Sequence, residues 1–94
     1  MLKKVLPLHP GEMLKEEMAE RGLSIQGLAR ALRVPATRIH AIVNGRRAIT
    51  ADTSARLGRY FGASPDFWLK MQVSYDIRCL DAQKIEREVL PQAS

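Results

Sequence analysis

The stretch SIQGLARALRVPATRIHAIVNG, residues 24–45, decides the fold predicted for this chain. Its first half holds four apolar residues at the i, i+3, i+4 and i+7 spacing of a helix with one buried side: Ile25, Leu28, Ala29 and Leu32. Pro35 interrupts this pattern and suits the first turn of a new helix. Three further residues mark the buried side of that second helix: Ile39, Ile42 and Val43. Gly45 then suits a left-handed helix end, so the stretch predicts two short helices joined by a tight turn.

The outer side of the second helix carries small, polar and basic residues. At about 100° per residue, the positions opposite its buried side are Thr37, Ala41 and Asn44, flanked by Arg38 and His40. A short helix with such an outer side, set on another short helix, is what a helix-turn-helix presents to the major groove of DNA. These residues alone leave a second interpretation open, namely two ordinary core helices of a small bundle.

The chain has 94 residues, which suits one domain, and its composition is that of an ordinary globular protein. Its net charge of +5 is unevenly distributed. Between residues 30 and 59, seven arginines stand against a single acid, Asp52: Arg30, Arg33, Arg38, Arg46, Arg47, Arg56 and Arg59. A basic block centred on the second helix is the pattern expected of a surface that binds a phosphate backbone. A solvated charged surface can also produce such a count.

Cysteine usage and the first residues narrow the class of protein. The single cysteine, Cys79, excludes an intramolecular disulfide and a cysteine-rich zinc site, and we expect its side chain to be partly buried. Residues 1–10 contain no apolar run long enough for a signal peptide or a membrane helix. We therefore expect a cytoplasmic protein with no cofactor and no metal.

The chain is expected to divide into an arm, a helical domain and a tail. Residues 1–9 predict an extended arm, with Val5 and Leu6 on the body of the protein. Residues 10–80 predict an all-α domain of five helices, and residues 81–94 predict a short C-terminal helical tail.

Three helices besides the pair at 24–45 are marked by their terminal residues. The first is expected from Pro10 to about Arg21, where Gly22 stops it. Its buried side is expected to hold Met13, Leu14 and Met18. Thr50 predicts the cap of a helix over about 51–61 that Gly62 ends, with these core residues: Leu57, Tyr60 and Phe61. Ser64-Pro65-Asp66 predicts a cap, a first position and an acidic second position for a last helix over about 65–80.

That last helix carries more apolar residues than one buried side needs. One side gathers Phe67, Trp68, Met71 and Tyr75, and we expect Trp68 to pack in the core. A second stripe, turned by about 120°, consists of Leu69, Val73, Ile77 and Leu80. The second stripe needs a partner, most simply the same helix of a second copy, which predicts a homodimer. The alternative is that residues 81–94 fold back and cover it.

Three segments of the chain resemble the lambda-repressor-like, XRE-type helix-turn-helix family and, more narrowly, the HigA/VapI antitoxins. They are LHPGEMLKEEM at 8–18, VPATRIHAIVNGRRAIT at 34–50 and ADTSARLGRYFGASPDFWLKMQ at 51–72. The resemblance implies a five-helix domain that dimerises and binds an inverted-repeat operator in its own promoter. It also implies a protein partner, a HigB-type toxin of the RelE-like fold that cleaves mRNA. By this resemblance, the chain would neutralise the toxin, and the two proteins together would repress the operon.

The resemblance also assigns residues to the DNA interface. The base edges would be contacted by Ala36, Thr37, Arg38, His40 and Ala41. The DNA backbone would be held by Ser24, Gln26, Asn44, Arg46 and Arg47, with Ile25 beside them at the start of the first helix of the pair. In many relatives the position of Pro35 holds Ser or Thr, whose hydroxyl caps the second helix and can bond a phosphate.

Other function classes fit the sequence less well. An XRE-type repressor with no toxin partner would share residues 24–47, and only the SPDFWL segment at 64–69 favours the antitoxin. An enzyme would need a nucleophile or paired carboxylate near His9 or His40, and neither histidine has one at a suitable spacing. A protein-interaction module would not need the block of arginines.

Overall fold

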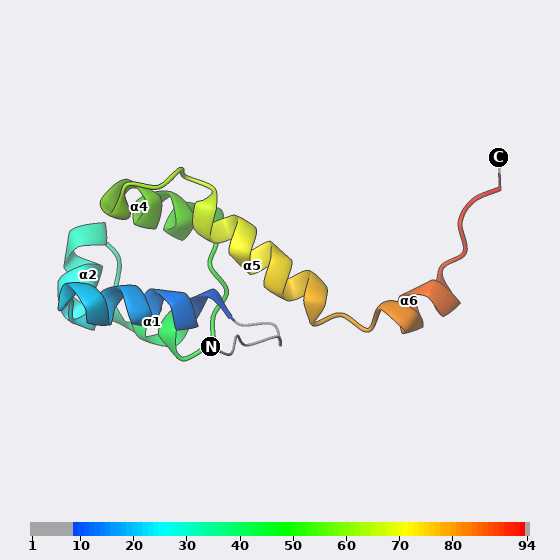
Figure 1. The fold of residues 1–94 in the computed structure, drawn as a ribbon, viewed down its shortest axis with the longest axis horizontal. Helices are drawn as coiled ribbons and strands as arrows, with labels where there is room; N and C mark the ends of the chain where they lie inside the picture. The colour runs from blue at the N-terminus through cyan, green and yellow to red at the C-terminus, as the bar shows by residue number, and fades with distance from the viewer. Residues whose placement is uncertain (1–8, 94) are drawn as a thin grey trace.

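The computed structural model describes residues 9–93, and within them the protein is entirely helical, as predicted (Figure 1). The described residues form six helices: α1 (Pro10–Arg21), α2 (Ile25–Leu32), α3 (Ala36–Val43), α4 (Ala51–Phe61), α5 (Phe67–Arg78) and α6 (Ala82–Glu88). The expected arm at residues 1–9, with Val5 and Leu6, lies outside the described residues except for His9.

The helix ends follow the local signals in the sequence. Gly22 and Gly62 end α1 and α4 in the left-handed conformation, with φ of 65° and 81°. Ser24 accepts a hydrogen bond from the Gly27 amide as the cap of α2, and Thr50 accepts one from the Thr53 amide as the cap of α4. Pro35 is the N-cap residue of α3 and makes no side-chain capping bond.

Some sequence-based expectations about individual residues were wrong. Helix α5 begins at Phe67 instead of Pro65, because the Ser64 hydroxyl bonds to the Asp66 carboxylate (2.9 Å) and these residues form a turn. Met13 and Tyr60 are exposed, because neighbouring side chains on their helices occupy the positions that face the core. Cys79 is also exposed instead of partly buried, since it follows the end of α5, where that helix no longer covers the core.

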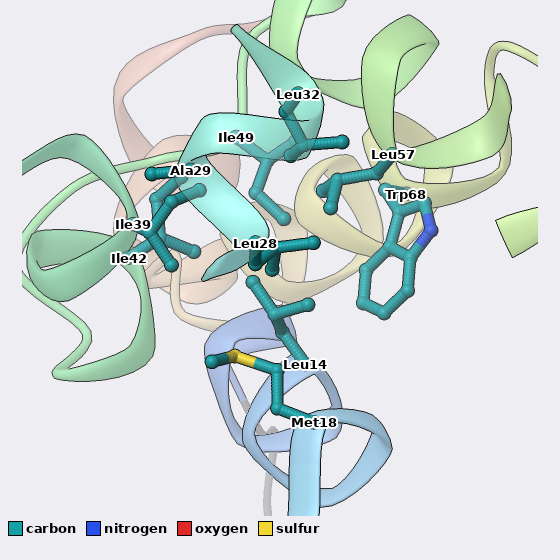
Figure 2. Packing of buried hydrophobic residues seen from close by; sticks show 10 residues of the cluster. All are labelled: Leu14, Met18, Leu28, Ala29, Leu32, Ile39, Ile42, Ile49, Leu57 and Trp68. Atoms are coloured by element: carbon teal, nitrogen blue, oxygen red, sulfur yellow. The ribbon is translucent and has the colours of Figure 1, made fainter. Parts of the chain in front are cut away.

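The core lies where α1 to α4 and the first half of α5 meet (Figure 2). It consists of Leu14, Met18, Leu28, Ala29, Leu32, Ile39, Ile42, Ile49, Leu57 and Trp68. Trp68 is 2% exposed, which confirms its predicted place in the core. The buried sides predicted for residues 24–45 are likewise confirmed, because Leu28, Leu32 and Ile39 lie in this cluster.

Close contact between α1 and α3 fixes the position of α3 in the domain. A side chain at Gly11 would overlap the carbonyl oxygen of Ile42, near the end of α3. Only a glycine therefore allows the start of α1 to lie against the backbone of α3. The buried side of α3 is held in this way, and its opposite side is left free.

Two buried polar residues, which periodicity did not single out, attach α5 to the rest of the domain. Gln72 accepts a hydrogen bond from the Ile49 amide (2.8 Å), in the segment between α3 and α4. Ser54 of α4 donates to the carbonyl of Pro65 (2.6 Å) and accepts from the amide of Leu69 (2.9 Å). These bonds fix the first half of α5 on α4 and satisfy backbone groups that would otherwise be buried without partners.

The second half of α5 leaves the body of the domain, and α6 lies further out along the same direction (Figure 1). Three residues of the predicted stripe are more than half exposed: Val73, Ile77 and Leu80, at 51%, 60% and 52%. Leu69 is half-buried. Helix α6 packs on no other helix of the described chain, and Ile85 within it and Val89 directly after it are exposed. The alternative that the tail folds back over α5 was therefore wrong.

Candidate nucleic-acid interface

The start of α2 and the outer side of α3 form one open groove of about 450 Å³. Its lining comes from Ser24, Ile25 and Gln26 on one side and Ala36, Thr37 and His40 on the other. Residues expected to hold the DNA backbone thus lie beside residues expected to contact base edges. The two groups are brought together because α2 and α3 pack against each other through their buried sides.

The outer side of α3 is small and polar. Thr37 and His40 are exposed, and Ala36 and Ala41 are half-buried. Because alanine side chains are short, this side allows a ligand to come close to the helix. The Asn44 amide donates to the His40 carbonyl (3.0 Å) and lies 3.3 Å from both ring nitrogens of His40. Asn44 therefore helps to orient the His40 ring at the end of α3.

Arg38 occupies a different position from these residues. Its side chain is 26% exposed, and its Nη1 lies 3.5 Å from Oδ2 of Asp52 in the first turn of α4. The structure places Arg38 at the flank of α3 that faces α4, and it does not line the groove. Sequence reasoning missed this partner, although Asp52 stood out as the single acid within the basic block.

The loop after α3 presents two exposed arginines, Arg46 and Arg47. Within residues 9–93, neither forms an ion pair with a carboxylate. Gly45 adopts a left-handed φ of 72°, and the Arg46 amide donates to the Ala41 carbonyl (2.9 Å). The loop is therefore held on the end of α3, where it presents two exposed positive charges.

His9 connects the start of α1 to this loop and to α5. Its Nδ1 accepts a hydrogen bond from the Gly11 amide (2.9 Å), and its ring meets the Tyr75 ring edge-on at 5.1 Å. Burial lowers the pKa of His9 below its usual 6.5, although Asp76 and the backbone of Arg47 partly oppose this shift. His9 is thus a structural residue, and its neutral form is the one that caps α1.

The described residues form neither a metal-binding group nor a membrane-spanning helix. Residues 9–93 contain no group of three or more histidine, cysteine or acidic side chains that could hold a metal ion. None of the helices in this part of the chain is long and apolar enough to cross a membrane.

Comparison with known proteins agrees with the helix-turn-helix geometry. Residues 14–68 match the helix-turn-helix family HTH_3. Virulence-associated protein I of Dichelobacter nodosus is 49% identical over 82% of this chain and 72% of its own length. A HigA-family addiction module antidote protein from Coxiella burnetii has a similar solved structure, with 46% identity, a TM-score of 0.87 and coverage of 94% of this chain and 100% of its own.

A second solved structure, that of the Pseudomonas aeruginosa antitoxin HigA with the higBA promoter, is 41% identical. It covers 93% of this chain and 99% of its own, with a TM-score of 0.84. The chain therefore belongs to the XRE-type helix-turn-helix family, within its HigA/VapI antitoxin group.

Proposed function

We propose that this protein is the antitoxin of a type II toxin–antitoxin module, which binds operator DNA as a homodimer and represses its own operon. Its family consists of DNA-binding antitoxins and regulators and not of enzymes. The observation that carries the proposal is the groove between α2 and α3, together with the exposed Arg46 and Arg47 in the loop that follows α3. Small polar side chains beside unpaired arginines are the combination that a helix entering the major groove needs.

The two parts of the interface have different tasks in this proposal. Helix α3 contacts base edges through Ala36, Thr37, His40 and Ala41. Arg38 also contacts a base edge when its ion pair with Asp52 is broken. The DNA backbone is held by Ser24, Gln26, Asn44, Arg46 and Arg47. Backbone contacts set the position of the protein and most of the salt dependence, whereas base contacts set the sequence preference.

The homodimer forms through the α5 stripe, which is Leu69, Val73, Ile77 and Leu80. The exposure of Val73, Ile77 and Leu80 supports this proposal, because three apolar side chains on one side of a helix are unfavourable in water. The two copies of α3 then lie about 34 Å apart, one turn of DNA, and the operator is a near-palindrome.

The proposed protein partner is a HigB-type toxin of the RelE-like fold, an mRNA-cleaving enzyme that this chain neutralises. The similarity to HigA proteins over more than nine-tenths of the chain supports this partner. The protein acts in the cytoplasm, where both its operator and the mRNA substrate of the toxin are found. Coexpression of this chain with a toxin gene beside its own should restore growth that the toxin alone arrests.

Two variants test the division of the interface. Thr37→Ala should relax the preference at one base pair and lower operator affinity by about 1 kcal/mol, because one base contact is lost. Arg46→Ala should weaken binding to all sequences alike and reduce the salt slope by about 1, because one phosphate contact is lost. The measurement is fluorescence anisotropy over a library of operator variants at several salt concentrations. Identical profiles for the two variants would contradict the proposed assignment.

A further inference from the structure

Asp52 is the only acid among residues 30–59, and it lies beside the proposed interface. An acid at such a place opposes DNA binding, because its charge repels the phosphates. General attraction to DNA therefore does not explain the role of Asp52. The contacts of its carboxylate indicate a more specific role.

The Asp52 carboxylate joins two arginines from different helices. Its Oδ2 lies 3.5 Å from Nη1 of Arg38 on α3 and 2.8 Å from Nε of Arg56 on α4. Arg56 in turn donates from Nη1 to the carbonyl of Leu32, the last residue of α2 (2.9 Å). The network therefore ties together the three helices that form the helix-turn-helix and its support, and it fixes Asp52 in place.

The network holds the Arg38 guanidinium but does not use all of its hydrogen-bond donors. Its Nε is buried and has no hydrogen-bond partner in the described part of the chain. Its only ion pair there is the 3.5 Å contact with Asp52, whose side chain is 59% exposed. A 3.5 Å pair whose carboxylate is largely exposed contributes little stability. A guanine offers Arg two acceptors in the fork geometry that the guanidinium fits.

We propose that Asp52 is a specificity-determining positioning residue, which holds the Arg38 guanidinium at the flank of α3. Arg38 leaves Asp52 only when a base binds the guanidinium more strongly than Asp52 does. This inference rests on the proposed DNA-binding function. At a correct site, the bidentate contact of Arg38 with guanine replaces the weak pair with Asp52. At other sites Arg38 stays with Asp52, so its charge adds little to binding of random DNA.

The test compares the wild-type protein with Asp52→Asn, Arg38→Ala and the double variant on operator DNA and on scrambled DNA of equal length. Asp52→Asn should raise the affinity for scrambled DNA by about two- to fivefold and the affinity for operator DNA by less. The ratio of operator affinity to scrambled-DNA affinity should therefore fall. In the Arg38→Ala background most of this change should disappear, because the released side chain is absent. Asp52→Glu keeps the carboxylate and should keep the ratio close to that of wild type.

Glu17→Gln is the matched control for charge. Glu17 pairs with Arg21 at 3.0 Å within α1, so this variant changes net charge equally without touching Arg38. It should shift binding to both DNAs by the same factor, and thermal melts should establish that every variant is folded. The inference is overturned if Asp52→Asn behaves like Glu17→Gln, or if its effect is the same with and without Arg38. A wild-type protein with no operator preference would instead overturn the proposed function itself.

Discussion

The two halves of α5 have similar apolar content and opposite surroundings. In the first half, Trp68 is 2% exposed and Gln72 is 4% exposed. In the second half, Val73 and Ile77 are more than half exposed. The first half completes the core of its own domain, whereas the second extends beyond the domain with its apolar side uncovered. An apolar pattern on a helix therefore does not by itself indicate which molecule covers it.

The largest effect is expected from Trp68→Ala, which removes the biggest side chain of the core. We expect a loss of about 3–5 kcal/mol in the free energy of unfolding, because the surrounding residues cannot fill the cavity. Chemical denaturation followed by circular dichroism measures it. Phe67→Ala, at a neighbouring residue that is 39% exposed, is the control and should cost clearly less. A loss for Trp68→Ala as small as that expected for an exposed residue, below about 1 kcal/mol, would mean that the first half of α5 is not part of the core.

Substitutions in the second half of α5 should weaken the dimer and leave the folding of the monomer almost unchanged. Ile77→Ser should weaken the dimer by about 1.5–3 kcal/mol per protomer, because each copy loses one buried side chain, while the monomer's stability changes by less than about 0.5 kcal/mol. Sedimentation equilibrium measures the association. A dimer that survives unchanged would show that the α5 stripe is not the interface.

The smallest effect concerns the point where the second half of α5 meets the body, at the contact of Tyr75 with His9. The pKa of His9 is lowered by burial in the folded protein, so the unfolded chain binds this proton more readily. The contribution of neutral His9 is complete above its usual pKa of 6.5 and is lost as pH falls below 6.5 through the lowered folded value. The free energy of unfolding of the wild-type protein should therefore decline as pH falls below 6.5. His9→Asn keeps a capping side chain without titrating, and it should show a flatter profile.

Much of the fold could be predicted because its signals are local. Gly22, Ser24, Thr50 and Gly62 determine helix ends through their own backbone preferences or hydrogen bonds to near neighbours. The start of α5 was harder, since Ser64 bonds to the Asp66 side chain instead of capping the helix. Where α5 begins depends on whether the Ser64 hydroxyl bonds to the Asp66 carboxylate or caps the helix.

Features that depend on tertiary pairing could not be predicted. Gln72 meets the Ile49 amide across 23 positions of the chain, and no helical period marks such a bond. The same holds for Arg38, which the helical period places beside the outer face of α3. Its partner Asp52 comes from another helix. The groove between α2 and α3 was predictable in its residues, because the period that buries Leu28 and Ile39 also directs Thr37 outward.

The central claim is that the outer side of α3 reads a specific DNA site. The most direct test is an anisotropy titration of the full chain on its own upstream promoter DNA and on random DNA, at about 50 and 200 mM salt. We expect binding to one near-palindromic site at least about 10³-fold tighter than to random DNA, with a steep loss of affinity at the higher salt. Equal affinity for both DNAs would contradict the claim and leave the outer side of α3 without a reading function.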